Sequence, residues 1–257
     1  LFSMTYIQPN ISRTTGVQII TEAIKNSQPF LFTRFGDGEM WMLKEEHTPE
    51  RLNRIKKALS LSESKYRGTM KRMRSELIDC WNDSDLVGIM GSNMNEYGVN
   101  YEYDPSTWSM TYEEAKRIGI SNSSVGDHML CRGKELGDPN NFKKIIKGKS
   151  IHVLSQNYMQ LQKNNLSEIL ECKITYTTIT RMPNNVVHNQ NQLLMELDKI
   201  KEDIVIFGCG AGGKYIGRYL KNVCGKVSLD FGATLDGWAG IISRPWFNNT
   251  QNYLLIK

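Results

Sequence analysis

Short apolar runs alternate with segments of helical periodicity along most of the chain, which limits the folds that it can adopt. A run of about four to eight apolar residues is typical of a buried strand, and apolar residues recurring every three or four positions are typical of a helix. Their alternation predicts the α/β class: a Rossmann-like, mainly parallel sheet with helices on both faces. The predicted strands are residues 30–32, 85–90, 149–155, 172–179, 203–207 and 227–229. The predicted helices are residues 14–26, 69–81 and 183–200, with others starting at Pro49 and after two glycine turns.

The composition is typical of a globular protein. A chain of 257 residues accommodates one large α/β domain, and because no repeat or linker interrupts it, we expect a single domain over residues 1–257. The five cysteines are scattered without a Cys-x-x-Cys pair, which argues against a disulfide framework or a zinc site and favours a cytoplasmic location. No apolar run approaches the ~20 residues of a membrane span. The first residues do not resemble a signal peptide.

A modest positive charge bears on the choice of partner. The net charge is +5, and the basic residues are densest over residues 56–74. They form either the solvated side of two amphipathic helices or a surface that attracts an anionic partner. Such a partner could be a nucleotide diphosphate, a lipid-linked acceptor or a membrane surface, so peripheral membrane association stays open. No nucleic-acid-binding motif accompanies the charge, and we expect no nucleic acid partner.

The apolar run at residues 30–32 leads into a glycine turn that carries two acids. The turn follows a predicted strand, and open α/β sheets bind their ligands at the carboxyl ends of strands. Residues i and i+2 of an extended turn point the same way, so Asp37 and Glu39 could hold Mg²⁺ or Mn²⁺ together with substrate phosphates. Alternatively, Asp37 caps a helix and Glu39 lies in its first turn, where the helix dipole favours acids.

The clearest predicted strand, residues 203–207, runs into a glycine-rich turn. The turn reads Gly-Cys-Gly-Ala-Gly-Gly-Lys over residues 208–214. Its spacing fits the Gly-x-Gly-x-x-Gly fingerprint of dinucleotide-binding folds, and Asp230 follows at the spacing of the acidic residue. A NAD enzyme or a methyltransferase carries that motif on its first βαβ unit, however. Too few residues follow Asp230 to build the remaining strands of such a fold.

The same turn begins like a P-loop, but Tyr215 stands where a Ser or Thr should bind Mg²⁺, which argues against an ATPase. The physical inference that remains is a phosphate site. Small residues such as Gly208 and Gly210 let backbone N–H groups approach a phosphate at a helix N-terminus, with Lys214 beside them. Tight packing between strand and helix is the alternative explanation for these glycines.

The segment at residues 97–132 shows no clear periodicity. It is rich in Tyr, Trp, Asn and Ser, as expected either of a lid that binds an acceptor or of an ordinary surface excursion. Asp127 and His128 adjoin within it, so His128 could act as a general base or be a structural histidine. Gln156 and Asn157 follow a predicted strand and could bind a nucleotide base or ribose, or cap the next helix.

Two motifs resemble one protein family. Arg-Phe-Gly-Asp-Gly-Glu at residues 34–39 resembles the Arg-x-Gly-Asp-Gly-Glu signature of GT-D-type glycosyltransferases, a bacterial family first catalogued as a domain of unknown function. The glycine turn at residues 208–214 and the segment Leu-Asp-Phe-Gly-Ala-Thr-Leu-Asp-Gly-Trp at residues 229–238 resemble the C-terminal part of that family. The resemblance therefore spans most of the chain. Many members carry a Gly-Pro-Thr-like turn where this chain has Gly-Cys-Gly-Ala-Gly-Gly.

This resemblance implies a metal-dependent hexosyltransferase. The donor would be a nucleotide-diphosphate sugar, such as a UDP-sugar. The acceptor would be a glycan or glycoconjugate in the synthesis of bacterial surface polysaccharide or glycoprotein. The resemblance assigns the cation, Mn²⁺ or Mg²⁺, to Asp37 and Glu39. A helix N-terminus stabilises a nearby anion by only ~0.3–2 kcal/mol, so a cation is the stronger device for a leaving diphosphate.

Further residues receive roles from the same resemblance. Arg34 and Gly36 would contact phosphate or brace the carboxylates. The remaining candidates for binding the donor are Gly208, Gly210, Lys214 and Asp230. Asp230 or Asp236 would bind sugar hydroxyls or deprotonate the acceptor, and Asp236 is favoured because Gly237 and Trp238 resemble an open edge with a sugar platform.

Four alternatives to these roles stay open. Arg34 could instead form a buried structural ion pair, and Asp236 could be a helix N-cap. The chain as a whole could be a non-catalytic Rossmann-type module that binds NAD or S-adenosylmethionine, or a silent scaffold in a glycan assembly.

Overall fold

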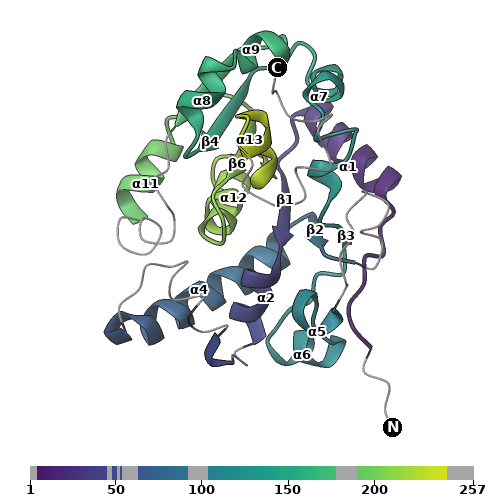
Figure 1. Cartoon of the computed structure of the whole chain (residues 1–257), viewed down its shortest axis with the longest axis vertical. Coiled ribbons are helices and arrows are strands. Elements are labelled where there is room, and N and C mark those ends of the chain that lie inside the picture. Colours follow the sequence, from purple (N-terminus) through teal and green to yellow (C-terminus); the bar gives the residue numbers. More distant parts are fainter. Residues whose placement is uncertain are drawn as a thin grey trace.

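The centre of the computed structural model is a seven-stranded sheet in the order β3-β2-β1-β7-β6-β4-β5 (Figure 1). The structure describes residues 5–44, 48–50, 53, 63–91, 104–177 and 190–241. All pairings between neighbouring strands are parallel, which confirms the predicted α/β, Rossmann-like class. The strands are β1 (Phe30–Phe35), β2 (Leu86–Ile89), β3 (Val125–Asp127), β4 (Ile151–Ser155), β5 (Ile174–Thr177), β6 (Ile204–Gly208) and β7 (Val227–Asp230).

Helices cover both faces of the sheet (Figure 1). The helices whose apolar side chains join the core on one face are α1 (Arg13–Asn26), α7 (Pro139–Ile145), α8 (Tyr158–Lys163), α9 (Leu166–Ile169) and α13 (Ala233–Trp238). Those that pack on the other face are α2 (Asp37–Lys44), α4 (Glu63–Asp83), α6 (Tyr112–Arg117), α11 (Gln190–Leu197) and α12 (Gly212–Asn222). The short helices α5 (Pro105–Trp108) and η2 (Leu130–Arg132) lie in connections.

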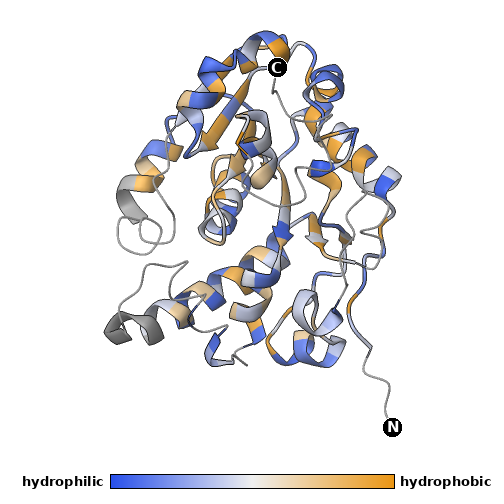
Figure 2. Ribbon diagram, viewed as in Figure 1, coloured by the Kyte–Doolittle hydropathy of each residue, from blue (hydrophilic) through white to orange (hydrophobic). Residues whose placement is uncertain are grey.

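Burial on both faces explains why the strands are continuous apolar runs. Every residue of β1 is buried, as expected of a parallel strand with helices above and below. Side chains alternate along it, so Phe30 and Phe32 join the α1 face while Leu31 meets α12. Orange apolar residues accordingly concentrate in the strands and the inner sides of the helices in Figure 2.

Tight packing of α12 accounts for two of the glycines near the second turn. A Cβ at Gly217 would lie 2.8 Å from both Leu31 Cδ1 and Phe207 Cζ, and one at Gly213 would lie 3.1 Å from the Phe207 ring. These distances are too short for a methyl group, so these two glycines let the helix lie close to the sheet. Strand–helix packing therefore explains the glycine at position 213 of the turn motif. A phosphate site is not needed to explain that residue.

Strand β1 is longer than the apolar run predicted. It continues through Thr33 and Arg34 because both polar side chains find partners inside the protein. Thr33 Oγ1 lies 2.7 Å from Ser84 Oγ, and Arg34 pairs with Asp230. Strand β3 was not predicted, because it has only three residues, with a glycine at its centre, inside a polar segment.

The predicted helices are found where the structure describes them. The first is α1, the second falls within α4, and part of the third is α11. Residues 183–189, and most of the helix expected from Pro49, lie outside the described residues, although Pro49 and Glu50 are themselves helical. Among the helices that the structure describes, none combines the length and apolar character needed to cross a membrane.

The order in which successive strands are placed across the sheet reverses between β4 and β6. Strand β4 leads through α8 and α9 to β5 at one edge, whereas its neighbour β6 leads through α12 to β7 on the other side. Open α/β sheets bind ligands outside the carboxyl ends of strands at such a switch point. The fold alone therefore points to the segments that follow these strands.

Candidate active site

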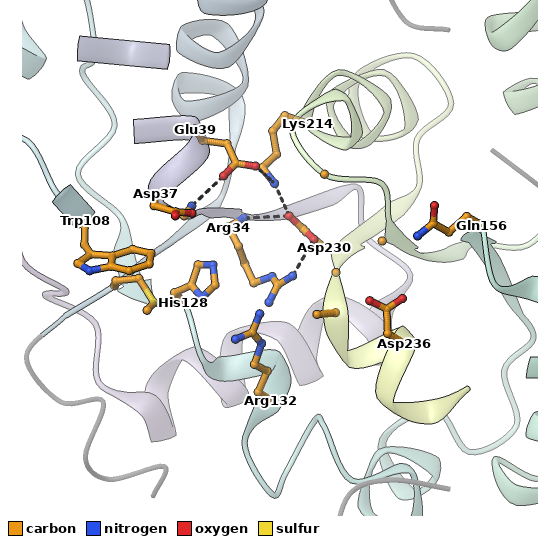
Figure 3. A pocket seen from close by; sticks show the side chains of 16 residues that line it. Arg34, Asp37, Glu39, Trp108, His128, Arg132, Gln156, Lys214, Asp230 and Asp236 are labelled. Carbon is orange, nitrogen blue, oxygen red and sulfur yellow. Dashed lines mark hydrogen bonds and ion pairs between the residues drawn. The ribbon is translucent and has the colours of Figure 1, made fainter. Parts of the chain in front are cut away.

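A cleft of about 370 Å³ opens at the carboxyl ends of the strands (Figure 3). Segments that follow β1, β2, β3, β4, β6 and β7 all contribute to it. The residues expected to bind the cation and the donor or to act in catalysis all line this one cleft: Arg34, Gly36, Asp37, Glu39, Gly208, Gly210, Lys214, Asp230 and Asp236. The two glycine turns, which lie at opposite ends of the chain, thus share one site.

A buried charge cluster joins the two turns. Lys214 Nζ lies 2.6 Å from Asp230 Oδ2 and 3.4 Å from Glu39 Oε1. Arg34 Nη2 lies 3.2 Å from the other carboxylate oxygen of Asp230. The side chains of Lys214 and Asp230 are each only 4% exposed, so water screens their attraction weakly. The cluster links α2, β1, α12 and β7 into one rigid unit.

The cluster keeps its members charged. Burial raises the pKa of Asp230, but the charges of Lys214 and Arg34 outweigh burial and hold that pKa below its ordinary value. Burial lowers the pKa of Lys214, but the charges of Asp230 and Glu39 outweigh it and raise that pKa above its ordinary value. A carboxylate held by two cations accepts a proton poorly, so Asp230 suits a structural role better than that of a base.

The turn after β1 has the geometry of a helix N-terminus. Asp37 and Glu39 both lie in the first turn of α2. The alternative to a metal site expected this of Glu39, but it had Asp37 as the helix N-cap, whereas Asp37 is the first residue of the helix. Glu39 Oε2 accepts a hydrogen bond from the Gly36 N–H at 3.0 Å, and Asp37 Oδ1 accepts one from the Gly38 N–H at 2.9 Å. A Cβ at Gly36 would lie 3.4 Å from Glu39 Oε2, so this glycine leaves room for the carboxylate. Both acids nevertheless line the cleft.

The side chains that could ligate a metal ion fit a cation only if substrate oxygens complete its coordination. Within the described ranges, no cluster of three or more His, Cys, Asp or Glu side chains could hold a metal ion. Mg²⁺ is commonly held by one or two carboxylates plus substrate phosphates, and Asp37 and Glu39 offer two hard carboxylates. Glu39 already bonds Gly36 and Lys214, so it would bind a cation through water or after exchanging a partner.

The two loops that follow β6 and β7 touch one another. A Cβ at Gly208 would lie 2.8 Å from the carbonyl oxygen of Gly232, so only glycine allows this approach. Gly210 has a φ of +59°, a left-handed conformation that favours glycine, and no atom lies within 4 Å of its Cβ position. Gly210 therefore opens the approach to the N-terminus of α12, where Lys214 stands.

Asp236 lies at the same end of the cleft as Gln156 (Figure 3). It is not a helix N-cap: Gly232 takes that position in α13, and Asp236 Oδ1 accepts a hydrogen bond from Asn157 Nδ2 at 2.6 Å. Asn157 lies at the N-cap position of α8, but its side chain makes no capping hydrogen bond there. The side chain instead orients the carboxylate of Asp236.

The expectation that Trp238 forms an open sugar platform is wrong. Its exposed fraction is 0%, and its indole Nε1 donates a hydrogen bond to the Gly137 carbonyl at 2.6 Å. The rings of Phe142 and Phe231 pack against it, with centroids 5.7 and 5.4 Å away. The short helix α13 turns Asp236 towards the cleft and Trp238 into the core.

Several lining residues were not assigned a site role from the sequence: Met90, Arg132, Gly232 and Ala233. His128, considered only as a possible base, also lines the cleft, directly after β3. Recognition of β3 would have placed His128 and Arg132 at the sheet's carboxyl edge. From the segment expected to bind an acceptor or to be a surface excursion, Trp108, His128 and Arg132 line the cleft, while Tyr97, Tyr101 and Tyr103 lie outside the described residues.

The architecture defines a known class of protein. Two solved structures of the domain of unknown function 1792 resemble this chain at 14% sequence identity, with TM-scores of 0.56 and 0.55. Each match covers 92% of this chain and 82% of the other. One is described as having a distinct glycosyltransferase fold, and the present chain shares that fold.

The family follows from the sequence match. The family model of the GT-D fold-like domain matches residues 12–238, so the chain belongs to the GT-D-like family. It is a glycosyltransferase, as its membership and its fold together indicate, and its substrates are a sugar donor and an acceptor. The alternatives of a non-catalytic module and a silent scaffold are therefore set aside. No curated protein matches the chain.

Proposed function

We propose that this glycosyltransferase moves a hexosyl group from a nucleotide-diphosphate sugar, a UDP-sugar, to a glycan or glycoconjugate, and that it requires Mn²⁺ or Mg²⁺. One observation supports the proposal most strongly. The acidic turn of α2 and the glycine turn before α12 line one cleft, to which they contribute Asp37, Glu39, Gly210 and Lys214. Carboxylates for a cation and backbone donors for a phosphate are thus combined, as a diphosphate donor needs.

Asp37 and Glu39 would hold the cation. When bound, the cation would supply positive charge to the diphosphate and help to orient it. Lys214 keeps Glu39 in place at 3.4 Å, and the Gly36 N–H fixes its other oxygen. The two carboxylates are therefore presented to the cleft in a fixed geometry before substrate enters.

The glycine turn would take the nucleotide side of the donor. It lies beside the switch point of the sheet, and Gln156 lines the cleft there. Gln156 offers an amide for a base or ribose. Gly208 and Gly210 carry no side chain that would keep phosphate oxygens from the backbone.

Asp236 would serve the sugar or the acceptor. Its carboxylate is half-buried and is oriented by Asn157. It could bind sugar hydroxyls or take the proton of the acceptor hydroxyl, because its partner Asn157 is neutral and no ion pair involves Asp236 among the described residues. Asp230, held between Lys214 and Arg34, would instead support the site.

The wider assignment follows the family. We place the reaction in bacterial surface polysaccharide or glycoprotein synthesis, in the cytoplasm, with peripheral membrane association as a possibility raised by the basic residues. We also infer that residues 1–257 form one domain. Support comes from β7, which lies between β1 and β6 and so joins the early and late parts of the sheet.

The test is donor turnover by variants of the acidic turn. Asp37→Asn and Glu39→Gln should each lower the rate of transfer by at least ~100-fold. The remaining activity should no longer depend on Mn²⁺, and circular dichroism should show an unchanged fold. Turnover would be assayed with a panel of nucleotide sugars and Mn²⁺. Glu135→Gln is the matched control, because Glu135 pairs with Arg13 at the surface and does not line the cleft.

Full activity in either cleft variant would remove that residue from the metal site. Wild-type turnover that is unaffected by a chelator would exclude the metal requirement but leave the glycosyltransferase assignment intact.

A further inference from the structure

Arg34 is held in a fixed position at the floor of the cleft. Its side chain is 6% exposed, and Nη2 bonds Asp230 Oδ1 at 3.2 Å. The guanidinium also fills the hollow over Gly232, where any Cβ would overlap Nη2. A rotation away from this place would break a buried ion pair, so a binding partner has to come to Arg34.

Two nitrogens of this guanidinium lack a partner. Nε and Nη1 of Arg34 are buried and make no hydrogen bond to any residue that the structure describes. Buried polar groups are almost always hydrogen-bonded, and an exception points to water or a ligand. Since the residue lines the cleft, the missing acceptor can arrive from there.

A second guanidinium lies nearby. Arg132, at the end of η2, also lines the cleft, and Figure 3 shows its guanidinium pointing toward that of Arg34. Two like charges facing each other repel, and an anion between them would relieve the repulsion. Asp230 does not serve both, because its two oxygens already bond Arg34 and Lys214.

We propose that Arg34 and Arg132 together bind the diphosphate of the donor, with Arg132 as a residue of the donor site not otherwise assigned. This inference rests on the proposed function. Guanidinium groups are planar and can each give two parallel hydrogen bonds to phosphate oxygens, and their charge does not depend on pH in the working range. The pair faces the space that Asp37 and Glu39 border from the other side in Figure 3.

Arg34 and Arg132 would stabilise the diphosphate as it leaves the sugar. The acceptor oxygen forms a bond to the anomeric carbon while the bond from that carbon to the diphosphate oxygen breaks. The electron pair of the broken bond stays on the diphosphate, and the acceptor proton passes to a base in the cleft, for which Asp236 is our candidate. Negative charge therefore grows on the diphosphate, where Arg34 and Arg132 stabilise it more than in the intact donor.

The experiment measures nucleotide binding by the full chain. Calorimetry with UDP, UMP and uridine, each with and without Mn²⁺, would compare the wild type with Arg132→Met. We expect UDP affinity to fall about 10- to 100-fold, a smaller loss for UMP, and an unchanged affinity for uridine. Arg117→Met is the matched control: it removes the same charge from an exposed position at the end of α6, outside the cleft.

The conservative variant separates charge from geometry. Arg132→Lys keeps the charge but loses the two-pronged contact, so it should recover part of the UDP affinity and raise the KM for the donor above that of the wild type. It also stands in for Arg132→Met if that variant does not fold.

Three results would overturn the inference. An unchanged UDP affinity in both Arg132 variants, or an equal loss for UDP and uridine, would remove Arg132 from the diphosphate site while leaving the proposed function untouched. A wild-type protein that binds no nucleotide diphosphate would overturn both proposals together.

Discussion

The guanidinium of Arg34 occupies the space in which a side chain at Gly232 would begin. Arg34 lies in β1, and Gly232 lies in the loop that follows the neighbouring strand β7. The carboxylate of Asp230 forms an ion pair with the guanidinium. Gly232 has a φ of +47°, which also favours glycine. The position of one cationic group in the cleft thus depends on the absence of a single methyl group.

Replacement of Gly232 by alanine should therefore displace Arg34. We expect the free energy of unfolding to fall by about 1–3 kcal/mol, because of the strained backbone, and donor affinity to fall at least ~10-fold. Chemical denaturation and nucleotide binding would measure the two effects. Gly148→Ala is the control, because Gly148 has a φ of +77° with no atom near its Cβ position. It should lose stability but keep donor affinity, and equal losses of affinity in both variants would contradict this account.

Lys214 should matter for stability as well as binding. Its removal leaves Asp230 as a buried carboxylate with one of its two cations gone. Breaking a buried ion pair by removing one partner typically costs about 3–5 kcal/mol. We expect Lys214→Met to lower the free energy of unfolding by an amount of that order. Adding Asp230→Asn should restore part of the stability without restoring transfer, and a double variant no more stable than Lys214→Met would argue against the pair.

Acid should weaken the fold through Asp230. The pKa of Asp230 is lower in the folded protein than its ordinary value of 3.8, so its ionised form stabilises the native state above that value. This contribution is lost as the pH falls through 3.8 towards the lower pKa of the folded state. The free energies of unfolding of the wild type and Asp230→Asn should therefore converge as the pH drops below about 4. Denaturant titrations over this range would show it, and parallel curves would exclude it.

Two buried tryptophans should differ in their effect on acceptor binding. Trp238 is fully buried against Phe142 and Phe231, so Trp238→Ala should cost about 3–5 kcal/mol of stability. Trp108 is also buried, at 7% exposed, but it lines the cleft as well. Trp108→Ala should therefore lower stability too and, unlike Trp238→Ala, raise the KM for the acceptor. Thermal unfolding together with acceptor titrations would measure both. A folded Trp238→Ala protein with a selectively raised acceptor KM would return Trp238 to a sugar-binding role.

Much of the fold could be predicted because its strands are buried on both faces. Strand β6 is an apolar run that ends in Gly208, and β1 begins with an apolar run at residues 30–32, so both are visible without any tertiary contact. Strand β3 lacked that signal, since Val125 is its only large apolar residue. The extension of β1 through Arg34 was equally hidden, because its partner Asp230 lies far along the chain.

The site was predictable for a related reason. Residues that follow parallel strands meet at one edge of the sheet, so two glycine turns at opposite ends of the sequence had to come close once the strands were parallel. Which way a side chain faces on a short helix was not predictable. The six residues of α13 turn Asp236 outward and Trp238 inward, and no periodicity is legible over so short a segment. Arg132 was missed because η2 follows the unrecognised β3.

Strand β7 lies between β1 and β6, and among the described strands it is the last in chain order. Until it is in place, β1 with β2 and β3 forms one fragment and β6 with β4 and β5 forms another, each with an open edge. Residues of both fragments line the cleft, so the cleft is complete only when β7 joins them.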